Sequence, residues 1–186
     1  MITLSALLLP IVLSAVFVFI ASSIIHMTPT WHRSDFPRTP NEDQIVAALR
    51  PLAIPPGDYI VPRAADMAEM RTPEFKDKLA KGPVLVMTVM PNGPFSMGRN
   101  LVLWFIYVLA VSVFVAYVAG RALPAGAPYL RVFQVASTVA FMGYAFALWQ
   151  LAIWYRRSLG LTLKATLDGL IYAGITAGTF GWLWPH

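Results

Sequence analysis

Hydrophobic residues gather in four long runs, and the stretch between the first and second runs is polar. The runs cover about residues 2–25, 101–120, 132–155 and 165–184. As helices, all four are long enough to cross about 30 Å of hydrocarbon, since a helix rises about 1.5 Å per residue. The pattern therefore predicts an all-α membrane bundle of four transmembrane helices.

The polar stretch, residues 26–99, predicts a small soluble α+β insertion between transmembrane helices 1 and 2. Proline and glycine divide it into short segments that alternate between helical and strand-like patterns, and Thr72 is placed to cap the second helix. The expected order is helix, strand, helix, strand, at about residues 40–50, 58–61, 73–81 and 84–90. The predicted organisation is thus one helix in residues 1–25, the insertion, and three helices in residues 100–186.

Composition and charge agree with a membrane protein. Hydrophobic residues make up 58% of the chain and charged residues 12%, against roughly 25% charged residues in soluble domains. Of the 23 charged residues, 17 lie in residues 26–99, where nine basic side chains balance eight acidic ones. This balance argues against a nucleic-acid partner. The absence of cysteine excludes disulfides and thiolate metal sites.

The basic residues predict an orientation in the membrane. Lys and Arg favour the cytoplasmic side, and the insertion carries nine of them, with three more between the third and fourth runs. Only Arg121 and Arg131 would then face outward. We therefore expect residues 26–99 in the cytoplasm and both termini outside.

A candidate metal site lies where the first run ends. His26, His32 and Asp35 occur within ten residues, and imidazole and carboxylate groups bind divalent metals. Met67 and Met70 are paired thioethers, which suit copper. The alternative is structural, because methionine also fills irregular cores and polar residues at a membrane boundary contact headgroups. Copper or another divalent metal is the cofactor that this pattern would hold.

Asp168 is the one acidic residue in or near a hydrophobic run, four residues after Lys164. A carboxylate in a membrane is a functional hypothesis by default, such as a proton site. We expect Asp168 to lie in the first turn of its helix and to pair with Lys164, since these positions share a helix face. The alternative is a small proton-coupled transporter built around Asp168.

Small residues recur along the fourth run at helical spacing. They form two neighbouring stripes, which let helix backbones approach closely. The stripes are Gly169, Ala173 and Ala177, and Gly174 and Gly178. They predict close packing of this helix within the bundle or against another subunit.

Several local motifs together resemble a family of small bacterial inner-membrane proteins with four spans and no assigned activity. The motifs cover most of the chain: Trp31-His32-Arg33-Ser34-Asp35-Phe36, Pro40-Asn41-Glu42-Asp43, Ala65-Asp66-Met67, Gly93-Pro94 with Met97-Gly98, and Ala125-Gly126-Ala127-Pro128-Tyr129. The resemblance implies the bacterial inner membrane.

Three functional hypotheses follow from the sequence. The first is a non-catalytic accessory or assembly subunit of a larger complex, with the lipid bilayer and other membrane-protein subunits as partners, because the insertion is small and no complete catalytic set is evident. The second is a metal-handling protein that uses His26 and His32 with the paired methionines. The third is the transporter around Asp168.

Overall fold

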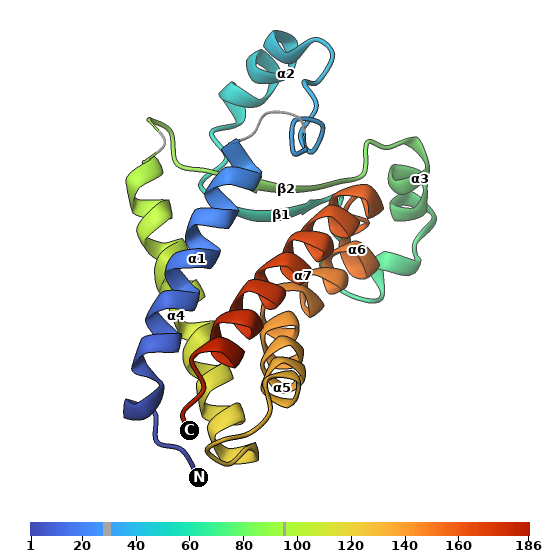
Figure 1. The fold of residues 1–186 in the computed structure, drawn as a ribbon. Coiled ribbons are helices and arrows are strands. Elements are labelled where there is room, and N and C mark those ends of the chain that lie inside the picture. The colour runs from blue at the N-terminus through green and yellow to red at the C-terminus, as the bar shows by residue number, and fades with distance from the viewer. Residues whose placement is uncertain (28–30, 95) are drawn as a thin grey trace. The chain divides into compact units, whose positions relative to one another are not determined.

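The chain forms two units, which are described separately (Figure 1). The computed structural model describes residues 1–27, 31–94 and 96–186, and it is mostly helical, at 67%. The first unit, Met1–Pro37 with Ser96–His186, is a helix bundle, and the second, Arg38–Phe95, holds a two-stranded sheet. Residues 31–37 therefore belong with the bundle, although the sequence pattern assigns them to the insertion.

Three helices of the bundle are long and apolar enough to cross a membrane. They correspond to the first three hydrophobic runs, extended by a few residues at most ends. The first is a short 3₁₀ turn continued by α1, the second is α4, and the third consists of α5, a π-helical segment and α6. The first helix comprises the 3₁₀ turn (Ser5–Leu7) and α1 (Leu8–Met27), and the second is α4 (Met97–Ala122). The third comprises α5 (Tyr129–Phe141), the π segment (Met142–Phe146) and α6 (Leu148–Tyr155).

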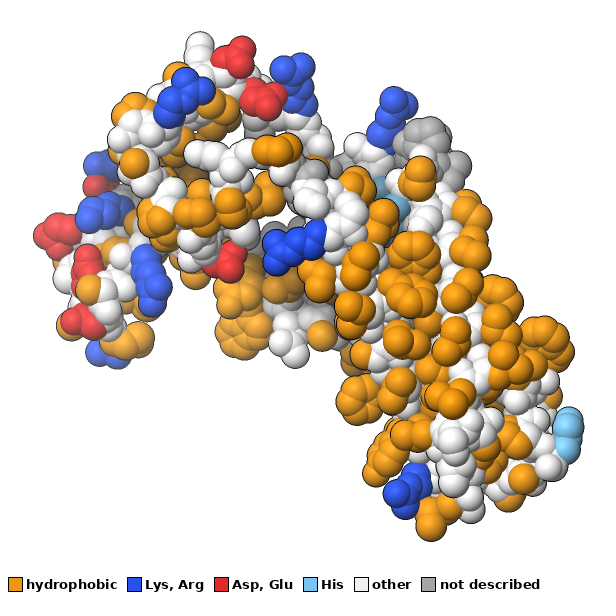
Figure 2. All heavy atoms as spheres, turned by 90° about the vertical axis from the view of Figure 1, so that its left-hand side faces the viewer, with side chains coloured by type: hydrophobic (Ala, Val, Ile, Leu, Met, Phe, Trp, Pro, Cys, Tyr) orange, Lys and Arg blue, Asp and Glu red, His pale blue; other side chains and the backbone are white. Residues whose placement is uncertain are grey.

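The outer surface of the bundle is apolar. Figure 2 shows hydrophobic side chains covering the bundle face formed by α1 and α4, whereas Lys, Arg, Asp and Glu gather on the second unit. Large side chains such as Leu9, Ile24, Val102 and Phe114 are each more than half exposed. Because exposing so many large apolar groups to water is unfavourable, this surface is consistent with a protein that lies in a lipid bilayer.

The fourth hydrophobic run forms α7 (Leu159–Trp182). This helix is not among the three that are both long and apolar enough to cross a membrane. The helix also begins earlier than expected. Arg156 takes a left-handed conformation, with φ of 52°, directly after α6, and α7 starts three residues later. Asp168 is consequently more than two turns inside the helix, and its expected stabilisation by the N-terminal dipole does not apply.

Helix α7 packs against α1, α5 and the π segment. A Cβ atom added to Gly169 would lie 2.8 Å from the Cβ of Ala145, and Ala173 and Ala177 are buried. This stripe is therefore in close helix contact. The other predicted stripe differs, because a Cβ at Gly174 would meet nothing within 4 Å in the described chain and one at Gly178 meets only the Tyr129 hydroxyl, at 3.7 Å.

The second unit has the predicted order of elements. Its strands pair antiparallel, with Tyr59 opposite Met87, and the Thr72 hydroxyl accepts a hydrogen bond from the backbone of Phe75, as the predicted helix cap requires. The first helix starts two residues later than expected because Asn41 before it is left-handed. The bounds are α2 (Glu42–Leu49), β1 (Gly57–Val61), α3 (Pro73–Lys81) and β2 (Leu85–Val89).

Candidate metal site

His26 lies in the last turn of α1, and its orientation is set by that helix. Its Nδ1 is 2.9 Å from the backbone carbonyl oxygen of Ser22, one turn earlier. A carbonyl oxygen only accepts hydrogen bonds, so Nδ1 carries the proton and Nε2 of the neutral ring keeps its lone pair. The Ser22 hydroxyl in turn accepts a hydrogen bond from the Trp104 indole at 2.8 Å, which ties this turn to α4.

His32 is oriented in the same way by a carboxylate. The backbone N–H of Asp35 donates to the carbonyl of His32 at 3.1 Å and closes a short turn. Within this turn, Nδ1 of His32 lies 2.6 Å from Oδ2 of Asp35. Because an ionised carboxylate only accepts, Nδ1 again carries the proton and the lone pair of the neutral ring is on Nε2.

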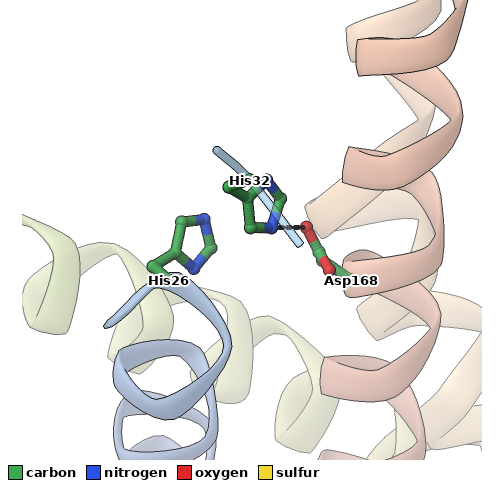
Figure 3. A group of neighbouring side chains, drawn as sticks. All are labelled: His26, His32 and Asp168. Carbon is green, nitrogen blue, oxygen red and sulfur yellow. Dashed lines mark ion pairs between the residues drawn. The ribbon is translucent and has the colours of Figure 1, made fainter. Parts of the chain in front are cut away.

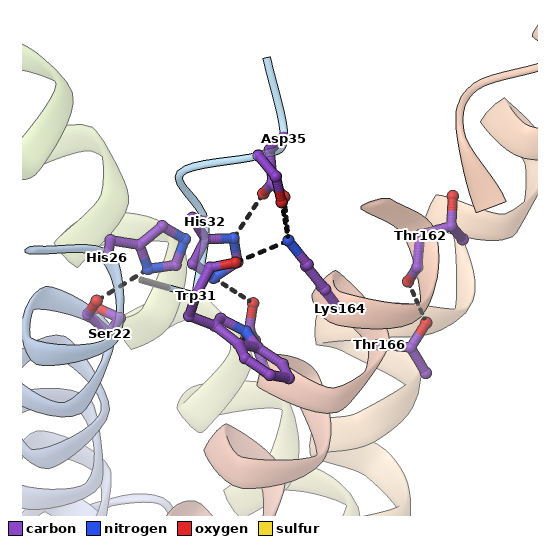
Figure 4. Close-up of polar contacts among 10 residues, drawn as sticks. Ser22, His26, Trp31, His32, Asp35, Thr162, Lys164 and Thr166 are labelled. Carbon is purple, nitrogen blue, oxygen red and sulfur yellow. Dashed lines mark hydrogen bonds and ion pairs between the residues drawn. The ribbon is translucent and has the colours of Figure 1, made fainter. Parts of the chain in front are cut away.

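Lys164 of α7 holds this turn against the bundle (Figure 4). Its ammonium group donates to Oδ1 of Asp35 at 2.8 Å, to the Ser34 hydroxyl at 2.9 Å and to the Trp31 carbonyl at 2.7 Å. The expected pair between Lys164 and Asp168 is therefore wrong, because the ammonium group is directed to the segment that follows α1. Among the described residues, its ion pair is with Asp35.

Asp35 is half-buried, and 8% of its side chain is exposed. Burial raises the pKa of its carboxyl group, but the hydrogen bonds from Lys164 and His32 and the positive charge of Lys164 lower it, and the net shift is downward. Asp35 is thus an ionised group at neutral pH whose two oxygens are both engaged. It orients His32, which differs from the direct ligand role that the sequence suggests.

Asp168 faces His32 from α7. One carboxylate oxygen lies 3.1 Å from Nε2 of His32, and the other accepts a hydrogen bond from the Trp31 indole at 3.3 Å. Only 6% of the Asp168 side chain is exposed. The contact to Nε2 is close enough for an ion pair, but it lacks the direction of a hydrogen bond, and Nε2 is a buried atom without a hydrogen-bond partner in the described part of the chain.

His26, His32 and Asp168 together form a group that could hold a metal ion (Figure 3). One donor atom from each lies within 4.8 Å of the other two. The two imidazole rings are stacked, with centroids 4.4 Å apart and planes 6° from parallel. Donors on one tetrahedral ion lie about 3.4 Å apart. The contact between His32 and Asp168, at 3.1 Å, already has about this length, so an ion would draw the His26 nitrogen closer by no more than about 1.4 Å.

The donor set differs from the one that the sequence suggests. Asp168 replaces Asp35 as the carboxylate that faces both histidines. Met67 and Met70 belong to the second unit, where 63% and 48% of these residues are exposed. A role for these thioethers therefore stays a prediction, and the site described here contains only nitrogen and oxygen donors.

Sequence reasoning missed the residues that orient the donors. Ser22 and Trp31 carry no metal-site signature, and their roles depend on backbone and indole contacts that span up to 137 positions in the chain. Helical spacing predicts that Lys164 and Asp168, which are one turn apart, lie on the same face of α7. It does not predict that Lys164 contacts Asp35 or that Asp168 faces His32.

Comparison with protein-family models, curated proteins and solved structures gives no match to this chain. The functional argument therefore rests on the geometry of the site.

Proposed function

We propose that this protein is a metal-handling membrane protein that binds one divalent transition-metal ion through His26, His32 and Asp168. The observation that carries the proposal is the orientation of the two histidines. In each ring an acceptor-only oxygen fixes the proton on Nδ1, which leaves Nε2 available as a metal ligand. Histidine ligands of metals in proteins are typically oriented by such a second hydrogen bond to a carbonyl or carboxylate.

The donor set favours some metals over others. Two imidazole nitrogens and one carboxylate oxygen resemble catalytic zinc sites and the facial triad of Fe(II) sites, both of which leave coordination positions open. Cu(I) prefers sulfur ligands, whereas the three residues of this group offer nitrogen and oxygen donors. We therefore propose zinc or Fe(II) as the ion, in preference to the copper that the paired methionines suggest.

Metal titration of the purified protein in detergent tests the proposal. We expect one equivalent of Zn²⁺ to remain after dialysis, and Co²⁺ to give the visible absorption of a nitrogen- and oxygen-ligated ion. His32→Ala and Asp168→Ala should each weaken Zn²⁺ binding more than tenfold, since each removes one of three ligands.

The matched control is His186→Ala, which removes the chain's third histidine, an exposed residue at the C-terminal end. This variant should bind Zn²⁺ like the unaltered protein. Less than about a tenth of an equivalent of zinc in the unaltered protein, or equal binding by His32→Ala, would overturn the proposal.

We further propose that α7 is a fourth span and that the protein lies in the bacterial inner membrane with both termini outside. Two sets of contacts support this. Lys164 and Asp168 contact the segment after α1, whereas the other end of α7 leads to Trp184, whose indole donates to the carbonyl of Pro124 in the turn between α4 and α5. Helix α7 thus runs between the same two ends of the bundle as α4.

The lower hydropathy of α7 has a physical reason that agrees with this proposal. Much of the helix is buried against its neighbours, and the hydroxyls of Thr176 and Thr179 donate to backbone carbonyls one turn earlier. A helix surrounded by protein does not need an apolar surface on every side, as a lipid-exposed helix does. The distribution of basic residues then favours the cytoplasm for residues 26–99.

The accessory-subunit and transporter hypotheses stay predictions. The transporter would use Asp168, the same carboxylate that we assign to the metal. Metal binding and transport are therefore distinguishable by whether Asp168→Asn changes zinc content in the purified protein.

A further inference from the structure

A cavity of about 590 Å³ lies beside the metal site, entirely within the bundle unit. Its size is in the range of small-molecule sites, roughly 300–1,000 Å³. His26 and Asp168 are among the residues that line it. A molecule in this cavity would therefore lie next to the proposed metal ion and to its open coordination positions.

Aromatic rings form much of the cavity lining. Trp104 stacks on Tyr107, with centroids 5.4 Å apart, and contacts Tyr172 edge to face at 6.1 Å. Tyr144 contacts both Tyr107 and Tyr172 edge to face. All four residues line the cavity. Such a lining favours a flat ring, which can pack against these faces and edges.

Two polar groups in this lining have no partner. The hydroxyls of Tyr144 and Tyr172 are buried and make no hydrogen bond in the described part of the chain, whereas the Tyr107 hydroxyl donates to the Gly143 carbonyl at 2.6 Å. Buried hydroxyls normally have a partner. Of the two tyrosines, Tyr172 is four residues after Asp168 on the same face of α7, so its hydroxyl is the one that we assign to a ligand beside the metal site.

The rest of the lining indicates where such a ligand comes from. Leu103 and Leu148 line the cavity from α4 and α6, and 52% of Leu103 is exposed. Both helices are parts of candidate membrane spans. The cavity is therefore bordered by side chains that face hydrocarbon, and a lipid-soluble molecule can approach it from the bilayer.

We propose that this cavity binds a lipid-soluble quinone, with its ring among the aromatic residues and one carbonyl oxygen accepting a hydrogen bond from Tyr172. The inference rests on the proposed metal site in one respect. A metal ion on His26 and Asp168 makes the polar end of the cavity positive, which favours a carbonyl oxygen over a cationic lipid headgroup.

Binding of decylubiquinone to the zinc-loaded protein in detergent tests the proposal. We expect saturable binding at one site, measured by equilibrium dialysis with correction for partitioning into empty micelles. Tyr172→Phe removes only the hydroxyl and should weaken binding roughly three- to tenfold. Tyr117→Phe is the matched control, since Tyr117 is an exposed residue of α4 outside the cavity lining, and it should bind like the unaltered protein.

Ala165→Phe gives a second, independent variant, because it adds a ring to a residue that lines the cavity without removing a metal ligand. It should abolish saturable binding. Non-saturable uptake by the unaltered protein, or equal affinity in Tyr172→Phe and Tyr117→Phe, would overturn the quinone assignment. The quinone assignment would also be overturned if oleate displaced the quinone and oleate binding weakened equally in Tyr172→Phe, because the ligand would then be a fatty acid.

Zinc content is measured in the same samples, so that the two proposals fail separately. Weaker quinone binding in Tyr172→Phe with a full equivalent of zinc supports the quinone site. Zinc binding without saturable quinone binding overturns this inference and leaves the metal site standing. Absence of zinc from the unaltered protein overturns the metal site, whatever the quinone result.

Discussion

Asp35 determines which nitrogen of His32 faces Asp168. The carboxylate accepts from Nδ1 at 2.6 Å, and Lys164 holds the same carboxylate from the other side at 2.8 Å. Three side chains from two distant segments thus fix one imidazole tautomer. Carboxylates that act on a metal through histidine are commonly as important for affinity as the ligands themselves.

Asp35→Asn should therefore weaken Zn²⁺ binding about 10- to 100-fold. The amide keeps the shape of the side chain but removes the charge that holds the proton on Nδ1 of His32, and it removes the ion pair with Lys164. Competitive titration with a zinc chelator measures the affinity, and the absorption of bound Co²⁺ reports a change in ligand geometry.

Asp77→Asn is the control for this variant, because Asp77 also pairs with a lysine, Lys81, at 2.6 Å, but both side chains are more than half exposed. Exposed pairs contribute little to stability, so zinc affinity should not change. Equal affinities for the two variants, together with unaltered Co²⁺ absorption, would contradict the orienting role of Asp35.

The individual site residues could be predicted from the sequence, but their grouping could not. His26, His32, Asp35 and Asp168 are all recognisable as polar side chains at membrane boundaries. Which carboxylate meets which cation depends on how the segment after α1 folds against α7, and neither residue type nor spacing contains that information. For this reason the sequence favours a local pair of Lys164 with Asp168, whereas in the structure Lys164 pairs with Asp35 and Asp168 faces His32.

At the level of elements, α7 carries a residue of the candidate metal site on one face and a helix-packing surface on the neighbouring face. Asp168 contacts His32, and the next residue, Gly169, lies against Ala145 of the π segment. π-helical segments often occur at functional sites, and this one also supplies Tyr144 to the cavity. Hydrophobic runs and small-residue spacing predict the helices, but they do not predict the π segment or which small-residue stripe is in contact.

The two stripes of α7 should differ in their response to an added methyl group. Gly169→Ala places a Cβ 2.8 Å from Ala145, and overpacking of this kind typically costs about 1–3 kcal/mol. Gly174→Ala meets nothing within 4 Å and should be neutral or stabilising, by up to about 1 kcal/mol from helix propensity.

Unfolding of the two variants in mixed micelles with increasing denaturing detergent measures this difference. Equal stabilities would show that Gly169 is not in a tight contact. A large loss for Gly174→Ala would instead indicate that this stripe contacts a further helix or a second chain.

For the whole molecule, the ends of the chain lie at the same end of the bundle. The backbone N–H of Ile2 donates to the Gly120 carbonyl, and that of Gly126 donates to the Pro185 carbonyl. The N-terminal end therefore contacts the last turn of α4, and the C-terminal end contacts the turn that joins α4 to α5. This arrangement requires an even number of crossings if α1 and α4 cross the membrane, and α7 would be the fourth in the topology that we propose.

The natural absence of cysteine makes this topology directly measurable. Single cysteines introduced by Ala125→Cys and His186→Cys should react with an impermeant maleimide in intact cells. Those introduced by Ser158→Cys and Asp43→Cys should react only after the membrane is permeabilised, since the orientation that we propose from the basic residues has them in the cytoplasm. All four positions are exposed.

The pair of Ser158→Cys and His186→Cys decides the role of α7, because these positions flank that helix. Labelling of both from the same side would mean that α7 does not cross. If these two positions are labelled from opposite sides but all four variants react in the reverse of the expected way, the four spans stand and the orientation is contradicted.

The sequence separation within the site has a consequence for biosynthesis. Trp31 and Asp168 are in contact although 137 positions separate them, and His32 is next to Trp31. At about 5–20 residues per second, translation takes roughly 7–27 seconds to proceed from one to the other. During that time the two histidines have left the ribosome without their carboxylate partner. The three proposed ligands can therefore come together only after α7 has been made and has joined the bundle, so we expect metal loading to follow the synthesis of α7.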